Sequence, residues 1–308
     1  EYGLFLAKAV TLIFGLVCSL AVMLSLLGKQ SENHKGAFEV THLNEQYESM
    51  SETIMLAMLN SAEQKLKLKE VKETKKDKLK GQKVAAKKKA DDNSVTKRVY
   101  VLNFKGNVSA SEVDNLREEV TAVLSQASGS DEVVLRLESP GGTVHGYGLA
   151  ASQLDRIKKK NIPLTVCVDK VAASGGYAMA CVADKILAAP FAIIGSIGVV
   201  AQIPNFNRLL KKNDIDFELL TAGEYKRTLT LFGENTDKGR EKYIEDLEVI
   251  HELFKNFLHE RRPSVDVKTV ATGEIWLGTK ALEVDLVDDI QTSDEYLVSC
   301  IEDANVYE

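Results

Sequence analysis

The stretch Glu132-Val-Val-Leu-Arg-Leu-Glu-Ser-Pro-Gly-Gly142 decides the fold of this chain. Its first six residues are mainly apolar and include β-branched side chains, which is typical of a buried strand. Ser-Pro-Gly-Gly at 139–142 is a turn signal, and residues 144–160 beyond it have apolar side chains at helical spacing. The stretch therefore predicts a strand that ends in a glycine turn and leads into a helix.

The same alternation of strands and helices continues on both sides of this unit. Alternation of this kind is typical of βαβ units, so the sequence predicts an α/β domain with a largely parallel sheet. Residues 276–290 close the domain. The other expected strands are 99–104 and 163–168, and the other expected helices are 109–128, 174–183 and 237–261.

Residues 9–27 form a run of 19 residues without a charged side chain. A helix of that length can cross the hydrocarbon core of a bilayer. The run is longer than the apolar region of a signal peptide, and Leu26-Leu-Gly-Lys29 is a poor cleavage site. We therefore expect residues 1–28 to be an uncleaved transmembrane anchor, with a signal peptide or a buried helix as alternatives. A second apolar run at 186–204 is interrupted by Pro190 and glycines, which favours short buried strands over a second span.

Two segments of different character lie between the anchor and the α/β domain. Residues 29–64 place apolar side chains at helical spacing, which predicts an amphipathic helical segment that packs on the domain or on a partner chain. Residues 65–97 are lysine-rich, with 12 lysines against three acids between Lys65 and Lys89. Such a stretch cannot bury enough apolar surface to fold alone, so we expect a solvated linker or a charged helix. Contact with anionic lipid headgroups is the more specific alternative.

Composition excludes several classes of protein. The chain has a net charge of −6; because the lysine-rich segment is strongly positive, the remainder is strongly acidic, which argues against a nucleic-acid partner. The cysteines Cys18, Cys167, Cys181 and Cys300 show no metal-type spacing and are expected to be free thiols, buried in the fold. His251 lacks the second histidine of a zinc-binding helix. We expect no metal and no cofactor.

Ser174 lies in Ala172-Ala-Ser-Gly-Gly-Tyr177, shortly after an expected strand. A serine among small residues at a strand-to-helix turn is well placed to be an exposed nucleophile. Its hydroxyl needs a base, yet no histidine lies between His145 and His251. Lys226, which ends the sequence Gly-Glu-Tyr-Lys, is the candidate base. The pair predicts a Ser/Lys hydrolase, in which burial would keep the lysine neutral.

Glycines near this serine offer backbone donors for a developing oxyanion. Gly175 follows the serine, so its N–H can face the site with no side chain in the way. Gly141 and Gly142 end the opening stretch and leave room for their amides to approach a substrate. Ser196, in Gly-Ser-Ile-Gly, can hydrogen-bond the lysine amine and orient it. Each motif alone is a common turn, and only their order and strand contexts together predict an acyl-transfer site.

In combination these motifs resemble the signal peptide peptidase A (protease IV) family, over residues 99–291 and in the N-terminal anchor. The matching elements are Glu138-Ser-Pro-Gly-Gly142, Ala172-Ala-Ser-Gly-Gly-Tyr177, Gly195-Ser-Ile-Gly-Val199, Gly223-Glu-Tyr-Lys226 and Gly273-Glu-Ile-Trp-Leu-Gly278. The resemblance implies a crotonase-like (ClpP-like) fold. The chain departs from the family at Glu138, where asparagine is frequent, and we assign that position no role.

The resemblance also implies a role for each candidate residue. Ser174 would be the nucleophile and Lys226 the base, with Ser196 helping to hold the lysine. Gly175 and one glycine of the pair 141–142 would form the oxyanion hole. Family members assemble as rings, so we expect a homo-oligomer in which one chain completes the dyad and neighbours share the substrate groove.

Together these features predict a membrane-anchored serine endopeptidase that hydrolyses small or unfolded peptides, with remnant signal peptides among the candidates. Residues 98–308 would form the peptidase domain. The resemblance implies that this domain lies on the periplasmic face of a bacterial inner membrane, which the chain crosses once. The expected partners are peptide substrates, the lipid bilayer and further copies of the chain. A crotonase-type acyl-CoA enzyme and a non-catalytic membrane scaffold are the alternatives. The pairing of Ser174 with Lys226 argues against both.

Overall fold

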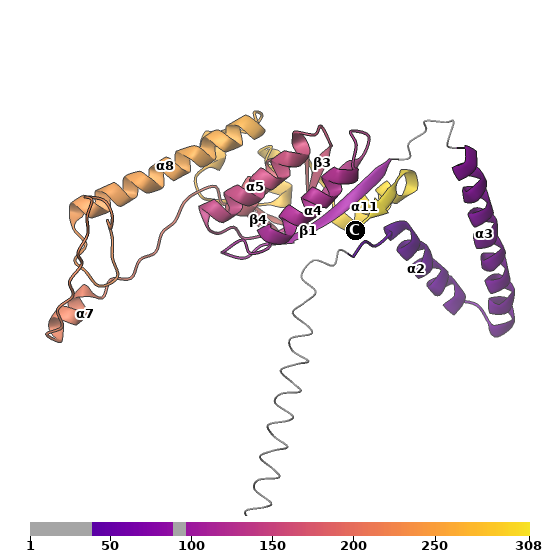
Figure 1. The fold of residues 1–308 in the computed structure, drawn as a ribbon, viewed down its shortest axis with the longest axis horizontal. Coiled ribbons are helices and arrows are strands. Elements are labelled where there is room, and N and C mark those ends of the chain that lie inside the picture. The colour runs from indigo at the N-terminus through magenta and orange to yellow at the C-terminus, as the bar shows by residue number, and fades with distance from the viewer. Residues whose placement is uncertain (1–38, 89–96) are drawn as a thin grey trace, which may run out of the picture. The chain divides into compact units, whose positions relative to one another are not determined.

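The computed structural model describes residues 39–88 and 97–308 (Figure 1). The predicted membrane anchor and Cys18 lie outside these ranges. Within them, no helix combines the length and the apolar character that a membrane span requires.

Six parallel strands form the main sheet, in the order β8-β5-β3-β2-β1-β9. This confirms the predicted parallel α/β arrangement. The central strands are apolar on both faces, as parallel sheets covered on both sides require. The strands are β1 (Arg98–Lys105), β2 (Glu132–Glu138), β3 (Leu164–Val168), β5 (Lys185–Ala188), β8 (Asp289–Ile290) and β9 (Asn305–Tyr307).

The alternation of side chains along each strand divides the core between the two faces of the sheet. In β2, Val133 and Leu135 belong to one cluster, with α4 (Val113–Gln126), α5 (Val144–Lys158) and α6 (Gly175–Ala180). The neighbouring Val134 belongs to the second cluster, which includes Leu297 of α11 (Ser293–Asp303) and Leu43 of α2 (Leu43–Ala57).

Helix α2 is the part of the predicted amphipathic segment that packs on the domain. Leu43 is buried, and the Asn44 side chain both donates to the Ala304 carbonyl (2.9 Å) and accepts from the Val306 amide (2.8 Å). The next helix, α3 (Ser61–Lys88), contains most of the lysine-rich stretch. Asn60 caps it by accepting from the Glu63 amide, as an N-cap residue should. The described part of the lysine-rich stretch is therefore a charged helix.

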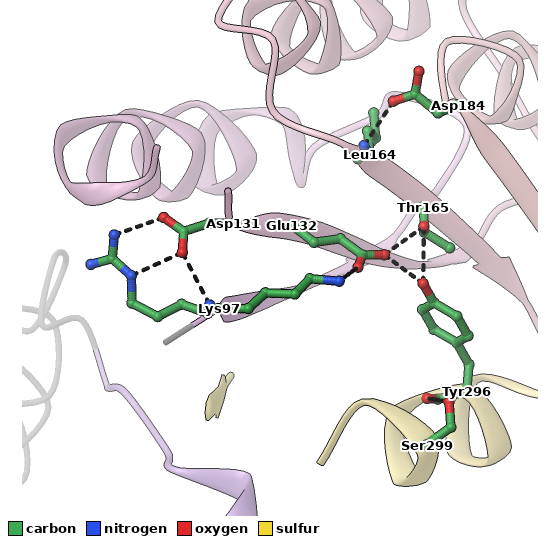
Figure 2. A network of polar contacts seen from close by, with 9 residues as sticks. Lys97, Asp131, Glu132, Leu164, Thr165, Asp184, Tyr296 and Ser299 are labelled. Carbon is green, nitrogen blue, oxygen red and sulfur yellow. Dashed lines mark hydrogen bonds and ion pairs between the residues drawn. The ribbon is translucent and has the colours of Figure 1, made fainter. Parts of the chain in front are cut away.

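A polar network joins the starts of the central strands (Figure 2). The buried Glu132 carboxylate accepts hydrogen bonds from Lys97 (2.7 Å), Thr165 (2.7 Å) and Tyr296 of α11 (2.5 Å). Beside it, Asp131 is fully buried and paired with the Arg98 guanidinium at 2.7 Å. Buried charges of this kind need such partners. The hydrogen bond from Tyr296 to Glu132 also ties α11 to the sheet.

A second, three-stranded sheet has the order β4-β6-β7. Its strands are β4 (Val171–Ala173), β6 (Ile193–Gly195) and β7 (Ile275–Leu277). β4 and β6 are parallel, with Ala173 opposite Gly195, so their carboxyl ends lead side by side into Ser174 and Ser196. Short strands also replace any second membrane span in 186–204, as predicted.

Residues 200–236 make up most of the connection between β6 and α8 (Asp237–Arg261) and include α7 (Asn207–Lys212). This 200–236 segment is mostly exposed and is organised by its own contacts, such as the Asn205 amide donating to the Gly233 carbonyl (3.0 Å). At the other end of α8, Arg262 pairs with Asp288 at 2.8 Å and anchors the helix to the domain. The remaining short helices are α9 (Val267–Val270) and α10 (Gly278–Glu283).

Three of the four cysteines lie in the part of the chain that the structure describes, and they agree with the prediction of free thiols. All three are free thiols, with Cys167 and Cys181 buried and Cys300 partly so. Burial raises the pKa of Cys167 and of Cys181 to about 12. Both thiols therefore stay protonated and unreactive at neutral pH.

Candidate active site

Ser174 occupies a strained turn between β4 and α6. Its backbone has φ 51° and ψ −120°, a conformation that residues other than glycine rarely adopt. Such strain costs about 1–3 kcal/mol and persists only where the surroundings enforce it. Here the Ser174 amide donates to the Gly195 carbonyl at 2.7 Å, and the Ser174 carbonyl accepts from the Ala178 amide at 3.0 Å. A strained strand-to-helix turn of this kind is typical of a nucleophile elbow.

The loop at 139–142 lies directly against this turn. Gly141 has φ 86°, and a Cβ atom there would lie 2.7 Å from the Ala173 carbonyl oxygen and 2.8 Å from Ser174 Cβ. A Cβ on Gly175 would lie 2.5 Å from Cγ of Tyr147. The glycines of both motifs are therefore required by close packing, and the fold brings the two motifs together as predicted.

The two amides of the glycine pair differ in their hydrogen bonds. The Gly141 N–H donates to Ser139 Oγ at 3.1 Å. Among the residues that the structure describes, neither the Gly142 N–H nor the Gly175 N–H has an acceptor. Gly142 and Gly175 are thus the amides free to bind a substrate oxygen.

Ser196 lies at the end of β6, beside the nucleophile turn. Like Ser174 it has φ 51°, and its amide donates to the Glu274 carbonyl at 2.7 Å. Gly195 before it has φ 92°, and a Cβ there would lie 2.9 Å from the Trp276 ring. Strand pairing therefore places Ser174 and Ser196 at neighbouring strand ends.

Lys226 is not joined to these residues by a hydrogen bond in the part of the chain that the structure describes. It is exposed in the 200–236 segment, in a turn where its amide donates to the Gly223 carbonyl at 3.2 Å. Across residues 39–88 and 97–308, no hydrogen bond or ion pair joins its ammonium group to Ser174 or Ser196. Within the described residues, one chain brings Ser174 close to the 139–142 loop but does not join it to Lys226.

Two family profiles cover the chain almost completely. The peptidase family S49 N-terminal profile matches residues 1–154, and the peptidase family S49 profile matches residues 156–307. The chain belongs to peptidase family S49. The family is one of proteases. The predicted resemblance to the protease IV family is therefore confirmed, and so is the prediction that the protein is a protease.

Similar proteins share most of the length of this S49 chain. It is 52% identical over 300 residues to a probable protease SohB of Buchnera aphidicola subsp. Schlechtendalia chinensis, covering 97% of this chain and 98% of that protein. It is 48% identical over 313 residues to a probable protease SohB of Haemophilus influenzae, covering 99% and 86%. Protease 4 of Haemophilus influenzae is 27% identical over 210 residues, covering 66% and 34%.

Three residues next to the site were missed by the sequence analysis. The Ser139 hydroxyl lies 2.5 Å from that of Tyr147, which donates to the Asn107 carbonyl at 2.8 Å. Ser139 stands inside the Ser-Pro-Gly-Gly motif, where the turn signal comes from the proline and the glycines. Nothing in the sequence pairs it with Tyr147 on the following helix or with Asn107 after β1.

Proposed function

We propose that this S49 chain is a serine endopeptidase on a crotonase-like fold, with Ser174 as nucleophile and Lys226 as base. The observation that carries the proposal is the strained Ser174 turn flanked by the free amides of Gly142 and Gly175. These features are those expected of a nucleophile and of preorganised oxyanion donors, two elements of acyl transfer.

The proposed reaction has two steps. Ser174 Oγ attacks the scissile carbonyl while the neutral Lys226 amine takes its proton, and the new oxyanion accepts hydrogen bonds from the two amides. The lysine ammonium then protonates the leaving amine as the C–N bond breaks. Water then attacks the acyl-enzyme and gives a proton to the lysine. The lysine returns this proton to Ser174 Oγ as the ester C–O bond breaks, which releases the carboxylic acid and regenerates the serine.

A solvated lysine is charged and cannot act as a base, so the reaction requires Lys226 to be buried. Apolar side chains of the same 200–236 segment are exposed, which is typical of a surface that a partner covers. They include Phe217, Leu219, Leu220, Tyr225, Leu231 and Phe232. We propose that assembly of several copies as a ring covers this segment, desolvates the lysine beside a Ser174 and forms a shared substrate groove.

The location and substrates complete the proposal. Residues 9–27 would anchor the enzyme in a bacterial inner membrane, with the peptidase domain on the periplasmic face. A site enclosed by several copies would admit small or unfolded peptides, such as remnant signal peptides, more readily than folded proteins. No metal or other cofactor has a part in the mechanism.

The test uses the full chain in detergent with a fluorogenic peptide. Ser174→Ala and Lys226→Ala should each abolish turnover, while Ser125→Ala and Lys160→Ala, at exposed positions outside the 200–236 segment, should leave it unchanged. A fluorophosphonate should label the wild type and not Ser174→Ala. Wild-type turnover in Ser174→Ala would refute the assignment.

Mixing the two inactive variants tests whether Lys226 serves the Ser174 of its own copy or that of another copy. If a lysine of one copy serves the serine of another, mixed assemblies of Ser174→Ala and Lys226→Ala regain part of the activity. If one chain supplies both groups, mixtures stay inactive. Size-exclusion chromatography with light scattering should show an oligomer in either case, and an active monomer would refute the proposed assembly.

A further inference from the structure

A directional chain of hydrogen bonds runs behind the proposed oxyanion site. The Asn107 carbonyl can only accept, so the single Tyr147 hydroxyl proton goes to it, at 2.8 Å. The Ser139 proton must then go to Tyr147 Oη, at 2.5 Å. That leaves the Ser139 oxygen to accept from the Gly141 N–H at 3.1 Å. The donor and the acceptor of each of these three hydrogen bonds are therefore fixed.

The pair of hydroxyl groups is enclosed by packing. Ser139 is 0% exposed and Tyr147 is 1% exposed. A Cβ on Gly106 would collide with both hydroxyl oxygens, and a Cβ on Gly176 would lie 2.6 Å from the Ser139 carbonyl oxygen. Only glycine at these two positions lets the backbone approach the hydroxyl pair and the Ser139 carbonyl this closely.

The same two residues contact both halves of the site. The Ser139 hydroxyl fixes the loop through the Gly141 amide, while the Tyr147 ring packs against Gly175, directly after the nucleophile. Burial raises the pKa of the Tyr147 phenol above its usual range, so the phenol stays neutral and remains a donor. The arrangement is thus independent of pH over the range in which a peptidase works.

We propose that Ser139 and Tyr147 are positioning residues that set the geometry of the oxyanion hole. By engaging the Gly141 N–H, Ser139 leaves the next amide, that of Gly142, to face the substrate opposite Gly175. Neither side chain touches the reacting atoms. The inference rests on the proposed function, because oxyanion donors contribute to the rate only when their direction is fixed before the charge develops.

The experiment compares Tyr147→Phe, Ser139→Ala and the double variant in the full chain, using a fluorogenic peptide. Each single variant should lower kcat by roughly 10- to 100-fold, somewhat less than loss of a whole oxyanion donor, with KM within about twofold of the wild type. Because the two hydroxyl groups act as one unit, the double variant should lose no more than about the larger single loss.

Tyr296→Phe is the matched control. It removes a tyrosine hydroxyl from the other polar network, on Glu132 (Figure 2). It should lower the melting temperature and leave kcat unchanged. Equal losses of kcat in Tyr296→Phe and Tyr147→Phe would show a general loss of stability and overturn the inference, as would wild-type kcat in Ser139→Ala and Tyr147→Phe.

Hydrogen exchange gives a readout that does not depend on activity. The amide of Gly141 should be protected in the wild type and exchange at least tenfold faster in Ser139→Ala, while amides of α4 keep their protection. Unchanged exchange overturns the inference even if Ser174 proves not to be the nucleophile. Conversely, absence of fluorophosphonate labelling at Ser174 with faster Gly141 exchange refutes the proposed function alone.

Discussion

Replacing Gly141 by alanine should disable the site more than it destabilises the fold. The backbone at Gly141 has φ 86°, where an alanine costs about 1–2 kcal/mol. In addition, the new methyl group would lie 2.7 Å from the Ala173 carbonyl oxygen and from the Gly175 nitrogen. Ordinary contact begins at 3.4 Å, so the loop or the nucleophile turn must retreat by roughly 0.5–0.7 Å.

Gly273 offers a control with the same backbone cost and no collision. It has φ 87°, and a Cβ there meets nothing within 4 Å. Gly273→Ala should lose about 1–2 kcal/mol of unfolding free energy, a few degrees in melting temperature. Gly141→Ala should lose more, because the collision adds strain of about 1–3 kcal/mol. Only Gly141→Ala displaces reacting groups, and a shift approaching 1 Å can cost on the order of 100-fold in rate.

The assay measures kcat on a fluorogenic peptide and the rate of fluorophosphonate labelling, with urea denaturation for stability. We expect Gly141→Ala to lose roughly 10- to 100-fold in both rates, while Gly273→Ala stays within about twofold of the wild type. If Gly141→Ala labels as fast as Gly273→Ala, the loop does not contact the reacting serine in the working enzyme, and our description of the site is wrong.

Three other predictions concern the base, acid stability and the membrane. Lys226→Arg should be as inactive as Lys226→Ala in the peptide assay, because arginine keeps its proton at working pH; retained activity would point to another base. Burial alone would raise the pKa of Asp131, but hydrogen bonds from Arg98 and the segment at Ser128 lower it to about 2. That carboxylate therefore contributes stability, on the order of 2 kcal/mol, that is complete above the unfolded-state pKa near 3.9 and lost as the pH falls towards 2. Asp131→Asn should show a flatter decline of unfolding free energy over that window in urea titrations, and a decline as steep as that of the wild type would contradict this. Finally, a chain beginning at Glu39, which keeps the contacts of α2, should be soluble without detergent, whereas chain 1–308 should stay in membranes after a carbonate wash; release of the longer chain by carbonate would exclude a spanning anchor.

The sequence alone predicted the regular elements well because their signals are local. The helix expected at 237–261 has those bounds in the structure, and strand β2 differs from its expected range by one residue. The helix expected from Ser109 begins at Val113 instead, because the Asn107 side chain accepts from the Ser109 and Ser111 amides and holds a turn there.

Features that depend on distant partners were not predictable. The three-residue strands β4 and β6 are too short to show a period, so the separation of a second sheet could not be foreseen. The contact of Asn44 with Val306 joins residues far apart in the sequence. The same distinction holds for the candidate site. The turns at Ser174 and its neighbouring glycines were predictable from local sequence, whereas the exposure of Lys226 was not, because it depends on how the 200–236 segment folds.

The pairing of β4 with β6 fixes the separation between the backbones of Ser174 and Ser196 in the candidate active site. Strands in a ladder lie about 4.8 Å apart, and Ser174 and Ser196 each follow a strand end in a register fixed by Ala173 and Gly195. Point substitutions can change the chemistry carried at either position, but they cannot change this interval. A one-residue deletion in either strand would reverse the direction of its side chains. Evolution or engineering of this site is therefore free to exchange functional groups and is confined to one spacing between them.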